Sequence, residues 1–203
     1  MAELLLFCAL VALLELDTTY IGQFMFSRPI IVGSVLGYLT GNFFLGLQLG
    51  VFTELIYLDF IPIGGVVPPS GAVSAGIGAL MAYFFGLPAY FAFFMGIISG
   101  ILFAFIEKRL RIMRARLLRG VEIKIMAGKL TPGLLMAQSI LFQFLVVFTF
   151  LLIMLTIIGP LAAYCGAAAP QKVRIAFQFS YFVVPWIGLA VMFISFSTKP
   201  KTD

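Results

Sequence analysis

The chain has 203 residues, of which 63% are hydrophobic and 10% are charged, and its formal net charge is +5. Soluble domains usually carry about a quarter charged residues, so this composition excludes an ordinary soluble protein and predicts lipid as the main solvent. The sequence has no histidine, which excludes histidine-based catalysis, a phosphohistidine carrier and a histidine-ligated metal in this chain. The two cysteines show no ligand spacing, so we expect no metal and no cofactor. Any phosphoryl transfer should occur on another polypeptide.

Apolar runs separated by glycine, proline and sparse charge fill the first half of the chain. They are residues 4–16, 30–40, 43–61, 72–85 and 87–106. The N-terminal segment begins with Glu3 rather than a basic residue and has no cleavage site, so we expect a retained helix and no removable signal peptide. Several runs are shorter than the ~20 residues needed to span a bilayer. They predict discontinuous or re-entrant helices, and simple kinks between ordinary spans are the alternative.

Residues 106–129 differ from the rest because they hold eight of the thirteen lysines and arginines. Apolar residues recur every three or four positions from Ile106 to Ile125, which predicts a helix with one narrow apolar face. Dense positive charge marks the cytoplasmic side of a membrane, so we expect a basic amphipathic helix on the cytoplasmic surface. Nucleic-acid binding is the alternative, and we expect none because the flanking apolar runs hold this segment at a membrane.

Two further apolar runs, residues 134–158 and 175–197, are long enough to cross a bilayer, and we expect Gly159-Pro160 to end the first of them. The pattern predicts an all-α, polytopic helical membrane protein with one membrane-embedded domain, residues 1–203. Its three parts are a transmembrane or re-entrant half (1–105), the basic amphipathic helix (106–129) and the C-terminal spans (130–203).

Glu54 is the most informative polar residue, because it lies inside an apolar run where a carboxylate is costly unless it has a partner or a function. Intramembrane acids usually face a cavity, a partner or a substrate path. A carboxylate can accept two hydrogen bonds at once, which suits neighbouring hydroxyls of a sugar. The alternative is a structural pair with a cation such as Arg28. Asp59 lies nearer the end of its run, where it could simply reach the membrane interface.

Other polar groups could complete a cavity around Glu54, although amides and hydroxyls also cross-link helices. The glycines between residues 64 and 71 suit close backbone approach at a broken helix and do not form a phosphate-binding loop. The candidate substrate-binding residues are Glu54, Thr53, Asn42, Gln23, Gly64, Gly65 and Ser70. No nucleophile–base pair or metal cluster is evident, so catalytic residues are not expected, and a transporter is favoured over a membrane enzyme.

The stretch from Gln23 through Arg28-Pro29, on to Gly41-Asn42, Thr53-Glu54 and Ile63-Gly64-Gly65, resembles the IIC component of the mannose/fructose/sorbose-type sugar phosphotransferase system. That resemblance implies a sugar permease subunit of a bacterial cytoplasmic (inner) membrane, in a hetero-oligomer with a IID membrane subunit. It also implies cytoplasmic IIA and IIB phosphoryl carriers, a hexose-type sugar as substrate, and an elevator-like motion of a core against a scaffold. Glu54 and residues 63–70 would then line the sugar path.

The sequence departs from this family pattern at three positions. Ser27 stands where the family often has histidine, Pro62 where asparagine is common, and Ser70 where aspartate is common. The C-terminal portion is also expected to be short. A divergent IIC-derived scaffold or regulatory subunit that does not transport sugar is therefore the alternative function.

Overall fold

The computed structural model describes residues 1–58, 60, 67–126 and 131–197, and it describes the backbone alone for residues 117–126, 195 and 196. Within these ranges the chain is all-α and contains no strand. The helices are α1 (Ala2–Leu16), α2 (Pro29–Leu39), α3 (Phe43–Tyr57), α4 (Gly71–Phe85), α5 (Ala89–Met126), α6 (Pro132–Ile153), η1 (Met154–Ile158), α7 (Gly159–Ala168) and α8 (Gln171–Ser197). The prediction of an all-α membrane protein is confirmed.

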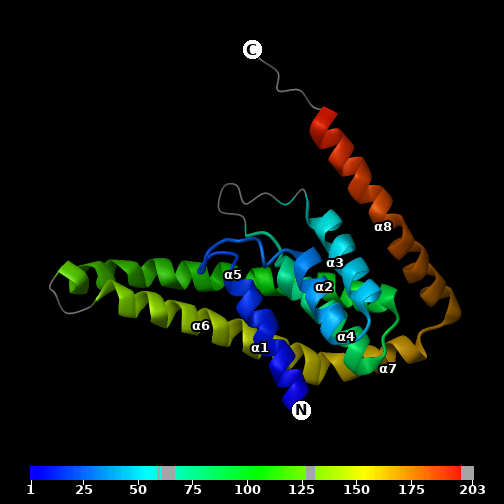
Figure 1. Cartoon of the computed structure of the whole chain (residues 1–203), viewed down its shortest axis with the longest axis horizontal. Helices are drawn as coiled ribbons and strands as arrows, with labels where there is room; N and C mark the ends of the chain where they lie inside the picture. Colours follow the sequence, from blue (N-terminus) through cyan, green and yellow to red (C-terminus); the bar gives the residue numbers. More distant parts are fainter. Residues whose placement is uncertain (59, 61–66, 127–130, 198–203) are drawn as a thin grey trace.

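Three short apolar helices, α2, α3 and α4, form a bundle beside the first half of α5 (Figure 1). α2 has 11 residues and α3 and α4 have 15 each, so at 1.5 Å per residue none spans a ~30 Å hydrocarbon layer. Glycines with positive φ end two of them: Gly41 follows α2 at +77°, and Gly86 caps α4 at +62°. The chain can therefore reverse direction within a few residues.

Close backbone contact holds α2 against α3. Gly33 and Gly37 on α2 face Gly46 and Gly50 on α3, so each helix presents glycines four residues apart to its neighbour. Small residues at this spacing let two membrane helices approach until their backbones touch. The pair positions the start of α2 beside the C-terminal half of α3, where Gly50 lies against Pro29.

The buried core surrounds α4, whose residues from Ala72 to Met81 are all buried. α4 contacts α1, α2, α3, α5, α6 and α7. Val11 from α1, Leu36 from α2 and Phe93 from α5 are among the fully buried side chains of this core. A helix that is apolar on all sides is expected at such a central position.

In the part of the chain that the structure describes, three helical segments are long and apolar enough to cross a membrane: Ala89–Arg116, Pro132–Ala168 and Gln171–Ile194. Their outward side chains, such as Leu145, Phe179 and Phe193, are exposed, which in this context indicates contact with lipid. In Figure 1, α5 and α6 form an arm that projects from the bundle, α1 crosses α6, and α8 extends away on the other side.

Two expected boundaries differ from the structure. The basic segment is not a separate helix, because α5 continues without a break from Ala89 to Met126; no helix-breaking glycine–proline pair interrupts it there. The span after Thr131 does not stop at Gly159-Pro160 either. The π-helical turn η1 leads directly into α7, and this wider turn accommodates a proline that lacks a backbone N–H.

Candidate functional site

A cavity of about 500 Å³ lies where the short helices meet the α5–α6 arm. It is within the usual size range of small-molecule sites. The loop after α1, the first turn of α2, the C-terminal turn of α3, the first turn of α4, and parts of α5 and α6 all contribute to its lining. Its charged and amide-bearing lining residues are Glu15, Arg28, Glu54, Glu107, Arg111 and Gln143. Residues far apart in the sequence thus line one cavity that has both polar and apolar walls.

Glu54 lines this cavity and uses only half of its carboxylate. Its Oε1 accepts a hydrogen bond from Arg28 Nη1 at 2.6 Å. Its Oε2 is buried and has no hydrogen-bond partner among the described residues. The Glu54 side chain is 21% exposed, and that of Arg28 is 52% exposed. The cation pair considered from the sequence is therefore present, together with a cavity and a buried acceptor atom that makes no hydrogen bond within the described residues.

Two helices begin at the cavity wall. α2 starts at Pro29 with Arg28 as its N-cap, and α4 starts at Gly71 with Ser70 as its N-cap. The Ser70 hydroxyl accepts a hydrogen bond from Val73 N at 3.2 Å. The partial positive charge at both helix starts favours an ionised carboxylate nearby, which is consistent with Glu54 at this junction. Discontinuous helices in transporters place their termini at substrate sites in a similar way.

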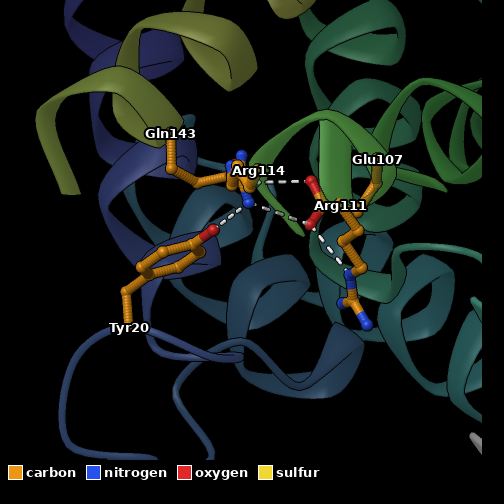
Figure 2. A network of polar contacts seen from close by, with 5 residues as sticks. All are labelled: Tyr20, Glu107, Arg111, Arg114 and Gln143. Atoms are coloured by element: carbon orange, nitrogen blue, oxygen red, sulfur yellow. Dashed lines mark hydrogen bonds and ion pairs between the residues drawn. The ribbon is translucent and has the colours of Figure 1, made fainter. Parts of the chain in front are cut away.

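A second set of polar residues lines the cavity from α1, α5 and α6. Glu15 is buried close to the side chains of Ser70 and Thr18. Glu107 is buried and accepts hydrogen bonds from Arg111 Nε and Gln143 Nε2, each at 3.0 Å. Figure 2 shows this network, in which Arg114 also bonds Tyr20 and Gln143. The network joins the loop after α1 to both helices of the arm.

Of the predicted site residues that the structure describes, Glu54 and Ser70 line the cavity. Thr53 is buried, and its hydroxyl donates to Leu49 O at 2.8 Å. Asn42 caps the opposite end of α3, about 18 Å from Glu54 by helix rise, and lines a separate hollow. Gln23 is exposed in the loop before α2, with φ of +55°. Gly64 and Gly65, together with Pro62 and Asp59, lie outside the described residues.

Sequence reasoning missed Glu15, Glu107, Arg111 and Gln143. Glu15 ends an apolar run, so the argument that singled out Glu54 could have been applied to it as well. Glu107 stands next to Lys108 and Arg109, and its neighbours suggested a solvated basic surface. Gln143 is flanked by apolar residues in α6, where a buried amide is costly without a hydrogen-bond partner. None of these signals identifies the others as neighbours.

Within the described residues, no group of three or more potential metal ligands lies close enough together to hold a metal ion. Both cationic residues of the lining form ion pairs, Arg28 with Glu54 and Arg111 with Glu107. The cavity therefore offers hydrogen-bond acceptors without a surplus of free positive charge. Such a chamber suits a neutral, hydroxyl-rich ligand better than a phosphate, which selects unpaired arginine or lysine.

Comparison with known proteins agrees with this architecture. The chain is 33% identical over 98 residues to N-acetylgalactosamine permease IIC component 1 of Escherichia coli (strain K12). That match covers 48% of this chain and 36% of the relative, so it spans little more than a third of the relative's length. A family model described as the PTS system sorbose-specific IIC component matches residues 1–200. The chain therefore belongs to the sorbose-specific IIC component family of the sugar phosphotransferase system.

Proposed function

We propose that this chain is the sugar-translocating IIC subunit of a phosphoenolpyruvate-dependent phosphotransferase system of the mannose/fructose/sorbose type. It crosses a bacterial cytoplasmic membrane several times and works with a IID membrane subunit. Cytoplasmic IIA and IIB carriers supply the phosphoryl group, because this chain has no histidine to carry one. Its substrate is a neutral hexose-type sugar. The name of the N-acetylgalactosamine relative makes that amino sugar the first substrate to test.

One observation carries the proposal: at a cavity built from interrupted helices, Glu54 has a buried carboxylate oxygen that no described residue hydrogen-bonds. A buried acceptor that makes no hydrogen bond destabilises a protein by about 1–3 kcal/mol. A sugar hydroxyl that reaches this oxygen through a small movement of the side chain would satisfy it, so part of the binding free energy comes from forming the missing hydrogen bond. Arg28 keeps the other oxygen occupied and fixes the orientation of the carboxylate.

Substitution of Glu54 by glutamine tests this role. The uptake assay uses membrane vesicles that contain the chain and its IID subunit, supplied with phosphoenolpyruvate and the soluble carriers. Labelled N-acetylgalactosamine, D-mannose and L-sorbose are the substrates. Glu54→Gln should lower uptake at least about 10-fold, because an amide is a weaker acceptor and no longer pairs ionically with Arg28. Membrane insertion should be unchanged, since Arg28 lines the cavity and water there can solvate its guanidinium group.

Glu3→Gln is the matched control. Glu3 lies on α1, outside the cavity lining, and accepts a hydrogen bond from the Tyr83 hydroxyl at 2.9 Å, which a glutamine oxygen can also accept. This variant should transport at the wild-type rate. Normal uptake by Glu54→Gln would refute the role given to Glu54. Lack of uptake by the wild-type chain, with all carriers present, would favour the non-transporting scaffold instead.

A further inference from the structure

The cavity lining also contains the buried carboxylate of Glu107, which the role given to Glu54 leaves unused. We propose that Glu107 is a second sugar-binding residue, which contacts a different hydroxyl from Glu54, and that Gln143 is the residue that positions it. Glu107 comes from α5 and Glu54 from α3, and both line the cavity. The inference rests on the proposed function, since it assigns a specificity determinant for the same neutral sugar.

Glu107 is fixed in position by donors from two helices. Its Oε1 accepts a hydrogen bond from Arg111 Nε at 3.0 Å and lies 3.6 Å from Arg114 Nη1. Its Oε2 accepts a hydrogen bond from Gln143 Nε2 at 3.0 Å (Figure 2). The residue is 6% exposed, so burial would be costly without these partners. A carboxylate held from both α5 and α6 is preorganised for a ligand.

The carboxylate keeps acceptor capacity after these contacts. An ionised carboxylate offers about four acceptor positions, and the hydrogen bonds described for Glu107 occupy two of them. Arg111 and Arg114 already balance its charge. A neutral hydroxyl donor therefore fits the remaining capacity better than a metal cation, which would have to compete with two guanidinium groups.

The contacts of Gln143 indicate a positioning role, because both ends of its side-chain amide bond to other side chains of the network. Its Nε2 donates to Glu107, and its Oε1 accepts from Arg114. The side chain is 3% exposed. Because the Gln143 amide joins Glu107 to Arg114, which also bonds Tyr20, it fixes the position of Glu107 Oε2 at the cavity wall.

A purely structural network is the competing explanation. In that case Glu107 would only brace the loop after α1 against the α5–α6 arm, through Arg114 and Tyr20. Its removal would lower the stability of the protein. It would not change which hydroxyl groups of the sugar contribute to binding. The two explanations therefore differ in a quantity that can be measured with modified sugars.

The experiment uses the full chain with its IID subunit in lipid nanodiscs and measures dissociation constants by isothermal titration calorimetry. D-Mannose, L-sorbose and N-acetylgalactosamine are titrated first, followed by the monodeoxy derivatives of the sugar that binds most tightly. The variants are Glu107→Gln, Glu54→Gln and Gln143→Met, with Glu3→Gln as the matched control. Thermal unfolding of each variant provides the stability readout.

In the wild type, loss of the hydroxyl that contacts Glu107 should weaken binding about 10- to 100-fold. The Glu107→Gln variant should bind this deoxy sugar and the parent sugar with about equal affinity, because the variant has already lost the hydrogen bond to that hydroxyl. Glu54→Gln should show this behaviour at a different hydroxyl. In Gln143→Met, the loss of affinity caused by removing a sugar hydroxyl should become smaller only for the hydroxyl that contacts Glu107. Glu3→Gln should behave as the wild type.

The role of Glu107 is overturned if Glu107→Gln keeps the full wild-type penalty for every deoxy sugar while its thermal stability falls. It is also overturned if Glu107→Gln and Glu54→Gln abolish the penalty at the same hydroxyl. If Glu107→Gln does not fold, Glu107→Asp is used instead, because it retains the charge and shifts the carboxylate. In this variant the affinity lost on removing the hydroxyl that contacts Glu107 should be smaller than in the wild type, and the losses at the other hydroxyls should not change. A wild-type complex that binds no sugar contradicts the proposed function itself. If the wild type binds sugar but the Glu107 variants lose as much affinity as it does for every deoxy sugar, only this inference is contradicted.

Discussion

A methyl group added at Gly46 should separate α2 from α3. A Cβ at this position would lie 2.6 Å from Gly37 Cα and still closer to the carbonyl oxygen of Gly33. Ordinary van der Waals contact begins at 3.4 Å, so the two backbones would have to part by about 0.8 Å or more. The atoms in the way belong to the main chain of α2 and cannot rotate aside as a flexible side chain could.

The size of the effect follows from this geometry. Overpacking a well-packed interior typically destabilises a protein by about 1–3 kcal/mol, and rigid backbone on both sides places Gly46→Ala at the upper end. At about 2–4 °C per kcal/mol for a chain of this size, the apparent Tm should fall by roughly 4–12 °C. Sugar affinity should fall as well, because the contact of α2 with α3 positions Arg28 beside Glu54.

Thermal unfolding of the purified protein in nanodiscs measures the change. Gly133→Ala on α6 is the matched control, since nothing lies within 4 Å of a Cβ added there. This variant should have an unchanged or slightly raised Tm, because alanine restricts the unfolded chain more than glycine does. If both variants unfold at the same temperature, α2 and α3 are not in the close contact described, and the reasoning is refuted.

Two further variants test the segments that border the cavity. Asp17 is buried and accepts hydrogen bonds from Phe24 N at 2.8 Å and Ser27 N at 3.4 Å. Asp17→Asn should destabilise the loop between α1 and α2 by about 1–3 kcal/mol, seen as faster limited proteolysis between residues 17 and 28, and a wild-type cleavage rate would contradict this. Ser70→Ala removes the N-cap of α4 and should lower the free energy of unfolding by about 1 kcal/mol. A Tm equal to that of the wild type would show that the cap contributes nothing.

Much of the fold could be predicted from hydropathy and from the positions of glycine and proline. The apolar run 72–85 appears as α4 with its start displaced by one residue, and the run 30–40 appears as α2. Proline and glycine positions predicted these short helices because each breaks the backbone hydrogen-bond pattern locally. The continuity of α5 and the passage through Gly159-Pro160 were not predicted. The latter depends on the π-helical turn η1, which neither hydropathy nor composition indicates.

The candidate site was predicted in part. Glu54 stood out because a carboxylate in an apolar run is costly wherever the run is placed. Its pairing with Arg28 was one of two alternatives, and only the structure shows that the pair and the cavity coexist. Thr53 and Asn42 share the helix of Glu54, yet their polar groups serve the helix backbone. Whether a polar side chain reaches the cavity depends on its direction around the helix axis and its distance along that axis. The identity of the residue gives neither.

The sequence by itself determined the solvent, the helical class and the family, because each of these depends on local hydropathy and short motifs. The tertiary structure alone decided that Glu15, Glu107 and Gln143 meet Glu54 in one cavity. These residues come from four helices that are distant along the chain. Their proximity depends on where those helices cross, and the crossings depend on backbone contacts such as Gly33 against Gly46, which act between segments that no local pattern connects.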